Sequence, residues 1–380
     1  MNQKEVSELR RRFRLERSAI SKIYGCYVNG SSREIISYID ESLGLLPQED
    51  AEKYLALLKK ALSGKLGKNL VDVVFSTEQV MHSEEHKLLM DLRASALKDC
   101  ELRQTFYQKI IESLDMEGSN YLILLAYDAY DVPHRNKDDE VDADASDEVF
   151  PYFVCSICPV KTQKPELGFF PGDNEFHSFS GQVVAAPELG FLFPAFDDRA
   201  ANIYNALFYT RKADALHQEV IDGLFHTTPP MCAAEQKEAF QSALTESLSD
   251  ACSLELVQTI YDRFREKIDA HKESRDPEPL SVTANDVAAI LQDSGIEEDK
   301  TSAFLQQCSD RFGEHSVLMP SNLIEHSHFE VKTSDATIAV APERSYMLEV
   351  RVIDGRRYLM IPADEDVEIN GFPVHVQSKQ

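Results

Sequence analysis

Three short apolar runs in the middle of the chain stand out from a largely polar sequence. They begin at Tyr121, Phe150 and Leu189 and read YLILLAY, FPYFVCSICPV and LGFLFPAF. Each run is rich in aromatic or branched residues and is bounded by Gly, Pro, Asn or Asp, which is typical of buried strands rather than helices. We therefore predict three buried strands of one sheet, around which the rest of the chain folds.

The chain before these runs shows a mixture of strand and helix patterns. Residues 20–28 and 34–40 are strand-like and flank an Asn-Gly turn, which predicts a hairpin. Apolar residues at helical spacing predict one helix after Pro47 and two more between residues 84 and 114. Helices and strands of this half are therefore expected to pack on the central runs.

The chain after the third run is predicted to be helical first. Asp198 is a residue type that favours helix N-caps, so we predict that it begins a helix over RAANIYNALFY. Amphipathic helices follow, the last of them ending near His271, and the charged, proline-containing stretch after it has the composition of a linker. Beyond the linker we predict a compact pair of helices and then strands.

These elements together predict an α+β protein. A central, mainly antiparallel sheet flanked by helices is expected in a body over residues 1–272, followed by a linker over 273–283. The C-terminal module over 284–380 is expected to be a helical pair followed by antiparallel β-hairpins. Two of these hairpins are predicted from the turn dipeptides Asp354-Gly355 and Asn370-Gly371.

The charge of the chain and its lack of long apolar runs limit the partners and the cellular location that we expect. Asp and Glu number 65 against 39 Lys and Arg, which gives a formal charge of −26 and disfavours nonspecific binding to nucleic acid or to anionic membranes. The first residues have no apolar core of a signal peptide, and no run of apolar residues is long enough to span a bilayer. We therefore predict a cytoplasmic protein that does not contact membranes.

The cysteines are interpreted as packed core thiols. The seven are scattered and odd in number, which does not favour a disulfide framework. Cys155 and Cys158 form a C-x-x-C, but they lie in a strand-like run, where residues three apart point to opposite faces. Phosphate-loop, calcium-loop and zinc patterns each fail on spacing, so we predict no cofactor and no metal.

Polar side chains at the ends of the three runs are the candidate site. Asp197 or Asp198 could act as a base or a metal ligand beside Arg199, which could hold an anion in a hydrolase-like enzyme. A helix cap and an ion pair would account for the same residues. The wider rim of this site, part of it on polar loops expected over 132–148 and 161–180, consists of Asp128, Asp131, His134, Asp147 and His177.

An arginine cluster marks the N-terminal segment. Residues 2–15 have the pattern of a helix with Val6, Leu9 and Phe13 on one face. The rest of the helix carries the candidate partner-contact residues Arg10, Arg11, Arg12 and Arg14. This cluster could bind RNA or an acidic partner, or the helix could dock on the acidic body of the same chain.

Several stretches resemble one family of uncharacterised bacterial proteins. The resemblance is carried by YLILLAYDAYDVP, VCSICPV, ELGFLFPAFDDR and VIDGRRYLMIP, with KEVSELRRRF at the start, and it runs nearly end to end. Members of this family are cytoplasmic proteins of about this length, mostly from anaerobic Gram-positive bacteria, and are catalogued only as a domain of unknown function. The resemblance implies a cytoplasmic protein and a continuous unit, and it assigns no activity, cofactor or catalytic residue.

Three functional hypotheses follow. The favoured one is a noncatalytic binding or adaptor protein, because the catalytic and metal patterns fail on spacing; its partner would be an unknown protein or a second copy of the chain. The first alternative is the hydrolase-like enzyme that uses the Asp/Asp/Arg rim. The second is an RNA- or translation-associated factor that binds through the arginine helix, which the net charge does not favour.

Overall fold

The computed structural model describes the chain apart from residues 136–140, 314–316, 326–327, 363–366, 370–371 and 375–380, and it does not describe the side chains of 134–135, 141–148, 369 and 373–374. The chain divides into two compact units. Unit 1 is Met1–Ala233 with Pro277–Pro279, and unit 2 is Ala234–Asp276 with Leu280–Gln380. The predicted α+β class is confirmed, because helices flank a large antiparallel sheet and C-terminal helices precede antiparallel hairpins.

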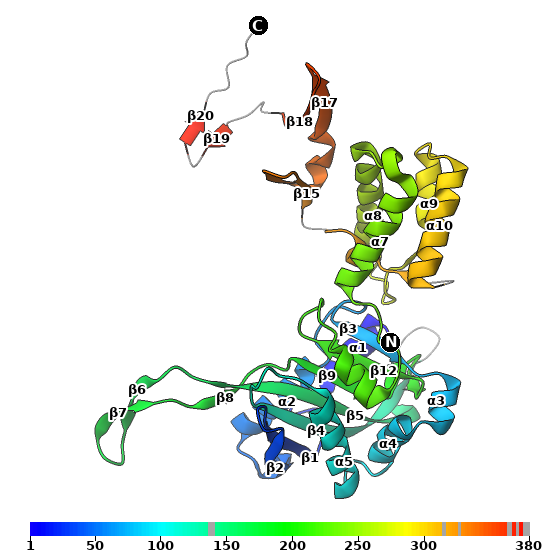
Figure 1. Cartoon of the computed structure of the whole chain (residues 1–380). Coiled ribbons are helices and arrows are strands. Elements are labelled where there is room, and N and C mark those ends of the chain that lie inside the picture. Colours follow the sequence, from blue (N-terminus) through cyan, green and yellow to red (C-terminus); the bar gives the residue numbers. More distant parts are fainter. Residues whose placement is uncertain (136–140, 314–316, 326–327, 363–366, 370–371, 375–380) are drawn as a thin grey trace. The chain divides into compact units, whose positions relative to one another are not determined.

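Unit 1 is built on an antiparallel sheet. Its strands are β1 (Lys22–Asn29), β2 (Glu34–Ser42), β3 (Leu70–Val74), β4 (Tyr121–Arg135), β5 (Val141–Thr162), β8 (Gln182–Val184), β9 (Leu189–Phe193) and β12 (Asn205–Thr210). Seven of them follow the order β2-β1-β4-β5-β9-β12-β3, and β8 pairs with the end of β5. The three apolar runs therefore form adjacent strands, β4, β5 and β9, at the centre of the sheet (Figure 1).

Helices cover both faces of this sheet. One face packs against α1 (Gln3–Arg12) and α2 (Gln48–Lys60), and the other against α4 (Glu84–Ala94), α5 (Cys100–Ser113) and the turns α6 (Gln218–Val220) and η2 (Ile221–Phe225). The short helices η1 (Leu43–Leu45) and α3 (Thr77–His82) lie in the connections. Cys155 belongs to the core under α4 and α5 and Cys158 to the core under α1 and α2, as the alternation of strand residues predicted.

Helix α2 approaches the sheet closely at Gly190 in β9. A Cβ atom at this position would lie 2.5 Å from the carbonyl oxygen of Cys155 and 2.8 Å from Cβ of Ala61 at the end of α2. Real Cβ atoms do not come this close to a backbone oxygen, so the helix and the sheet can meet here only across a glycine. The residue thus fixes the distance between two layers of unit 1.

The predicted helix over RAANIYNALFY is wrong. This segment forms β11 (Ala200–Asn202) and most of β12, and β11 pairs with β10 (Ala195–Asp197) in a tight hairpin. All six residues of β12 are buried, because the strand pairs on one side with β9 and on the other with β3 and contributes to the cores on both faces of the sheet. Asp198 and Arg199 have φ of 48° and 61° and form the two-residue turn, so Asp198 caps no helix.

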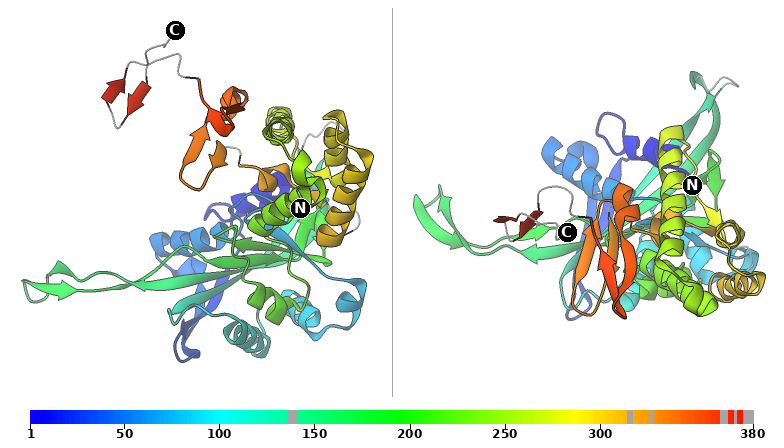
Figure 2. Two further views of the ribbon diagram at one scale, coloured as in Figure 1. Left: turned by 45° about the horizontal axis from the view of Figure 1, so that its top comes forward. Right: turned by 90° about the horizontal axis from the view of Figure 1, so that it is seen from above.

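The two predicted polar loops also differ from expectation. In the described part of the first, β4 and β5 continue as paired strands, for example Val132 with Glu148. The second holds β6 (Glu166–Phe170) and β7 (Glu175–Phe179), which pair with each other and not with the large sheet. We call β6, β7 and their turn the arm, because they project well beyond the sheet of unit 1 (Figures 1 and 2).

Unit 2 begins with helices. They are α7 (Ala233–Leu248), η3 (Ser249–Ala251), α8 (Leu254–Ser274), α9 (Ala284–Asp293), α10 (Glu298–Phe312) and α11 (Pro320–Leu323), with a short pair of strands β13 (Val282–Thr283) and β14 (Val317–Leu318). Phe240, Phe264 and Phe304 come together in the core of these helices. The predicted pair of helices after the linker, α9 and α10, is thus part of a larger helical group.

The C-terminal part of unit 2 consists of hairpins. The pairs are β15 (Phe329–Lys332) with β16 (Thr337–Val340), β17 (Glu349–Ile353) with β18 (Arg356–Met360), and β19 (Val367–Ile369) with β20 (Phe372–Val374), and η4 (Pro342–Met347) lies between the first two pairs. Asp354 and Gly355 have φ of 50° and 75°, which confirms the predicted turn. The predicted turn at Asn370-Gly371 lies outside the described residues.

Candidate functional site

Arg12 and Asp128 form the centre of the polar cluster at the end of β4. Helix α1 begins with a capping box of Asn2 and Glu5, and its apolar face is buried on the sheet, which places Arg12 over the strand. The guanidinium donates to both carboxylate oxygens of Asp128, Nε to Oδ2 at 2.5 Å and Nη2 to Oδ1 at 2.9 Å. The phenol of Tyr152 donates to Oδ2 at 2.8 Å, so the carboxylate, which is 1% exposed, is fully engaged.

Arg199 forms the second ion pair of the cluster. Its left-handed backbone in the β10–β11 turn directs the side chain toward α1, where Nη1 lies 3.0 Å from Oε2 of Glu8. Nη2 donates to the carbonyl oxygen of Pro133 at 2.9 Å, and the Tyr130 hydroxyl donates to Glu8. The guanidinium of Arg12 lies over the Tyr130 ring, 4.5 Å from its centroid, and thereby connects the two ion pairs.

Glu5 and Asp197 complete the cluster. Glu5 accepts hydrogen bonds from the backbone N–H groups of Asn2 at 2.7 Å and Arg199 at 3.2 Å. Burial nevertheless raises the pKa of Glu5 above its ordinary value, because desolvation outweighs these hydrogen bonds. Oδ1 of Asp197 lies 3.3 Å from the amino group of Met1, and Oδ2 accepts from the amide of Asn202 at 3.1 Å.

The structure brings only part of the predicted site together. Asp128, Asp197 and Arg199 join one cluster through α1, whereas Asp198 is exposed at the turn and Asp131 is exposed on β4. His177 lies on the arm, 3.2 Å from Asp173, and the side chains of His134 and Asp147 lie outside the described residues. In the cluster each carboxylate faces a cation or a hydrogen-bond donor, an arrangement that holds α1 on the sheet. Such mutual pairing leaves little capacity to bind a substrate.

The arginine helix, α1, packs against the sheet of its own chain. Arg12, predicted as a partner contact, is the partner of Asp128, and the apolar face of α1 is buried against the sheet. Arg11 and Arg14 are exposed, while the Nε of Arg10 is buried and has no hydrogen-bond partner among the described residues. The docking of this helix on its own acidic body therefore accounts for the apolar residues and for one of the four arginines.

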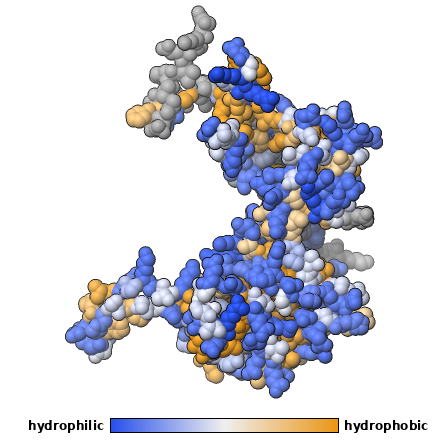
Figure 3. Space-filling view, viewed as in Figure 1, coloured by the Kyte–Doolittle hydropathy of each residue, from blue (hydrophilic) through white to orange (hydrophobic). Residues whose placement is uncertain are grey.

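The arm carries large apolar side chains that are exposed to solvent. Leu167, Phe169 and Phe176 share one of its faces, which we call the apolar face of the arm, since Phe169 pairs with Phe176 across the two strands. Leu167 is 77% exposed and Phe176 is 67% exposed, and the rings of Phe169 and Phe176 lie 5.2 Å apart. Figure 3 shows the resulting hydrophobic surface on the arm. This face was not predicted from the sequence, because residues 161–180 were expected to form a polar loop.

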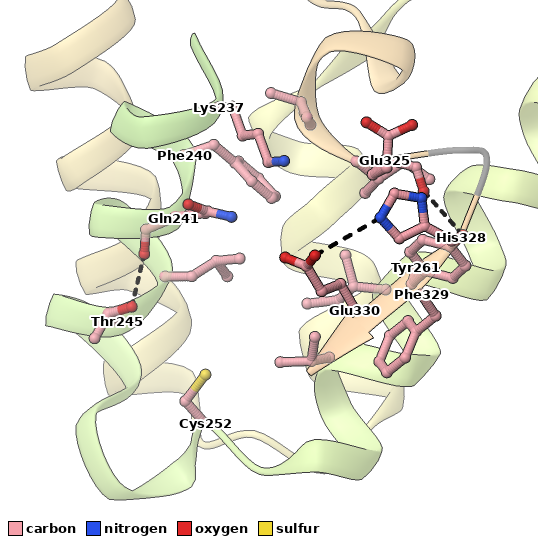
Figure 4. A pocket seen from close by; sticks show the side chains of 15 residues that line it. Lys237, Phe240, Gln241, Thr245, Cys252, Tyr261, Glu325, His328, Phe329 and Glu330 are labelled. Carbon is pink, nitrogen blue, oxygen red and sulfur yellow. Dashed lines mark hydrogen bonds and ion pairs between the residues drawn. The ribbon is translucent and has the colours of Figure 1, made fainter. Parts of the chain in front are cut away.

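A pocket of about 550 Å³ lies within unit 2. Helix α7 lies on one side, and β15 with Glu325 and His328 lies on the other, beside Tyr261 of α8 (Figure 4). Its walls combine apolar residues such as Phe240 and Ile260 with the polar side chains of Lys237, His328 and Glu330. None of these residues belongs to the predicted site. No sequence pattern indicated them, because the pocket joins elements about ninety residues apart.

The described part of the chain shows neither a metal site nor a membrane-spanning helix. No group of three or more His, Cys, Asp or Glu residues is placed there to hold a metal ion. None of the described helices combines the length and the apolar character that crossing a membrane would need. Among known proteins, a family model described as Domain of unknown function (DUF4317) matches residues 1–372. A comparison with curated proteins finds no match.

Proposed function

The chain belongs to this family of unknown function, and we propose that it is a noncatalytic binding protein that associates with a second copy of itself through the arm. The observation that carries this proposal is the apolar face of the arm, on which Leu167, Phe169 and Phe176 are exposed together. An isolated two-stranded hairpin is marginally stable in water, and contiguous exposed apolar surface is typical of contact sites. Both features favour a surface that is covered in the working state of the protein.

A second copy is favoured over an unrelated partner by the charge of the arm. The segment 161–184 contains two lysines and three acidic residues, so its formal charge is −1 in a chain of −26. The apolar face itself carries no charged residue, and a symmetric contact brings such a face against its own copy. Because the arm projects beyond the sheet, two arms can meet while the acidic sheets and helices of unit 1 stay apart (Figure 2).

The alternative hypotheses have less support. A hydrolase would need Asp197, Asp198 and Arg199 to converge on a substrate, but Arg199 pairs with Glu8 and Asp198 points into solvent. An RNA-binding role for the arginine helix would use Arg12, which is bound to Asp128. We also propose a cytoplasmic location, which rests on the sequence and on the family resemblance.

The test is the oligomeric state of the full chain. We expect sedimentation velocity and light scattering to show a concentration-dependent dimer for the native sequence. The variant L167T/F176T, which removes two apolar side chains but retains residues suited to a strand, should sediment as a monomer. The matched control L45T/V74T changes two exposed apolar residues elsewhere in unit 1, 88% and 59% exposed, and should remain dimeric.

Two results would overturn the proposal. A native chain that is monomeric at every concentration would show that a second copy does not cover the arm. A dimer that persists in L167T/F176T would show that the copies meet through another surface. Circular dichroism of both variants would establish that they are folded, since the substituted side chains are exposed and support no core.

A further inference from the structure

The pocket of unit 2 is a second candidate for binding, separate from the arm. Its apolar floor comes from α7 and α8, where Phe240 and Ile260 are 3% and 4% exposed and Leu244 lies beside them. The wall across from α7 is formed by β15 with Glu325 and His328 (Figure 4). A volume of about 550 Å³ is within the range of pockets that hold small organic ligands, so this space is large enough to bury one.

Two charged residues that line the pocket, Glu330 and Lys237, differ in whether they have an ion-pair partner. Glu330 is paired, because Nζ of Lys332 lies 2.8 Å from Oε1 and Nε2 of His328 lies 3.9 Å from Oε2. The hydrogen bond with Lys332 lowers the pKa of Glu330, so this carboxylate is held as a paired anion. Lys237 on α7 is half-buried and directs its ammonium into the pocket, where it forms neither a hydrogen bond nor an ion pair with the described residues (Figure 4). Its charge helps to lower the pKa of Glu330, but less than Lys332 does.

We propose that this pocket binds a small carboxylate with an apolar body. The carboxylate would meet the ammonium of Lys237 and the nearby amide of Gln241, and the apolar body would lie on Phe240, Leu244 and Ile260. A cation without a direct partner in a partly buried site favours an anionic ligand, because Glu330, the carboxylate that attracts Lys237, already has Lys332 as its ion-pair partner and is not within ion-pair distance of Lys237. A cationic ligand is disfavoured, since the carboxylate of Glu330 already has Lys332 as its partner.

A carboxylate is favoured over a phosphate ester by the number of donors. A phosphate in a protein is typically held by several backbone N–H groups or by the planar fork of an arginine. The pocket has no arginine among its lining residues and presents one lysine and one side-chain amide on α7. This donor set suits a group of one negative charge and two oxygens. The aromatic rings of Phe240 and Phe329 suit a ligand body that is apolar or aromatic.

Three probes of one shape test the proposal on the full chain: 4-phenylbutyrate, 4-phenylbutanol and 4-phenylbutylamine. We expect isothermal titration calorimetry to give saturable binding of the carboxylate, with an affinity about tenfold or more above that of the alcohol, as for a charge-assisted contact. The amine should bind more weakly than either. Equal affinities for acid and alcohol, a preference for the amine, or the absence of saturable binding for all three would each overturn the proposal.

Two variants place the binding in this pocket. Lys237→Met keeps the length and apolar stem of the side chain and should lower the affinity for the carboxylate to that for the alcohol, while the affinity for the alcohol stays within about twofold. The matched control Lys267→Met removes the same charge from an exposed position of α8 outside the pocket and should change neither affinity. An unchanged preference for the acid in Lys237→Met would reject the assigned cation.

A substitution at Val257 tests the site without touching its charges. This residue lines the pocket on α8 and is 41% exposed, so Val257→Trp adds volume toward the cavity from a position that the core does not require. Binding of both the acid and the alcohol should be lost in this variant, with the circular dichroism spectrum retained. Undiminished binding of 4-phenylbutyrate to a folded Val257→Trp protein would show that the probe binds elsewhere.

Discussion

Arg12 and Asp128 form a two-point ion pair between residues 116 positions apart in the chain, with the Nε–Oδ2 and Nη2–Oδ1 distances at 2.5 and 2.9 Å. The pair ties the N-terminal helix to a central strand of the sheet. Burial, reinforced by the charge of Asp128, raises the pKa of the neighbouring Tyr152 phenol well above its ordinary value, so the phenol remains a hydrogen-bond donor to the carboxylate.

Removal of Arg12 should strongly destabilise unit 1. In Arg12→Ala the carboxylate of Asp128, 1% exposed, would keep only the hydrogen bond from Tyr152 and would remain buried without a counter-charge. Breaking one partner from a buried pair costs about 3 kcal/mol or more. Urea unfolding followed by far-UV circular dichroism should show this loss in the free energy of unfolding.

Arg11→Ala is the matched control for this measurement. Arg11 lies next to Arg12 on α1 but is exposed, so its removal should change the free energy of unfolding by less than about 0.5 kcal/mol. If the two alanine variants were equally stable, the ion pair would contribute nothing to the attachment of the helix. A double-mutant cycle with Asp128→Asn would then measure the coupling directly.

The central strands could be predicted from the sequence because their signal is local. The runs at Tyr121, Phe150 and Leu189 are short, almost entirely apolar and bounded by Gly, Pro, Asn or Asp, which is typical of strands buried on both faces. The segment after Asp198 was mispredicted because its apolar residues fit a helical spacing as well as a strand. Most of the segment is a strand because β12 pairs with β9 and β3, and such pairing is a long-range property of the fold.

The candidate site was only partly predictable for the same reason. The polar residues at the strand ends were found because Asp128 and Asp197 follow apolar runs directly. Their partners could not be found, since Arg12 reaches Asp128 and the amino group of Met1 reaches Asp197 from positions more than a hundred residues earlier in the chain. The arm was missed because alternation of aromatic residues with Gly, Ser and His over only five residues is a weak strand signal.

Glu5 should make a measurable contribution to the pH dependence of stability. Burial raises its pKa in the folded state above the ordinary value of 4.5, so the folded carboxyl binds its proton more tightly than the unfolded one. Its stabilising contribution is then fully present below pH 4.5 and is lost as the pH rises through the folded pKa. The free energy of unfolding of the native protein, minus that of Glu5→Gln, should therefore decrease as the pH rises from 4.5.

The measurement requires unfolding curves of both proteins at closely spaced pH values, because other carboxylates change the stability of each protein in parallel. The difference between the two proteins isolates Glu5. A difference that is constant with pH, or that grows as the pH rises, would contradict the assigned direction of the shift. The amide of Gln retains an oxygen that can accept the N–H of Asn2, so the helix cap is largely kept.

Gly190→Ala should be among the most damaging single methyl additions in unit 1. The new Cβ would lie 2.5 Å from the backbone oxygen of Cys155 and 2.8 Å from Cβ of Ala61, so β5 and the end of α2 would each have to move away from β9. Overpacking of this kind costs about 1 to 3 kcal/mol, which a lowered melting temperature would report. Gly44→Ala is the control, since no atom lies within 4 Å of a Cβ at that position, and it should leave the melting temperature nearly unchanged.

The native protein should contain one rapidly reacting thiol. Cys100 is exposed and Cys252 is half-buried, whereas the other five cysteines are buried, and burial raises the pKa of Cys26 and of Cys158 to about 12. At about pH 8 such thiols remain protonated and shielded from a disulfide reagent. Ellman's reagent should therefore label Cys100 rapidly and Cys252 more slowly, and the remaining five thiols only in denaturant. The rapid phase should vanish in Cys100→Ser. A rapid phase that persisted there would contradict its assignment to Cys100, and a denatured titre two thiols short would show that two cysteines are oxidised.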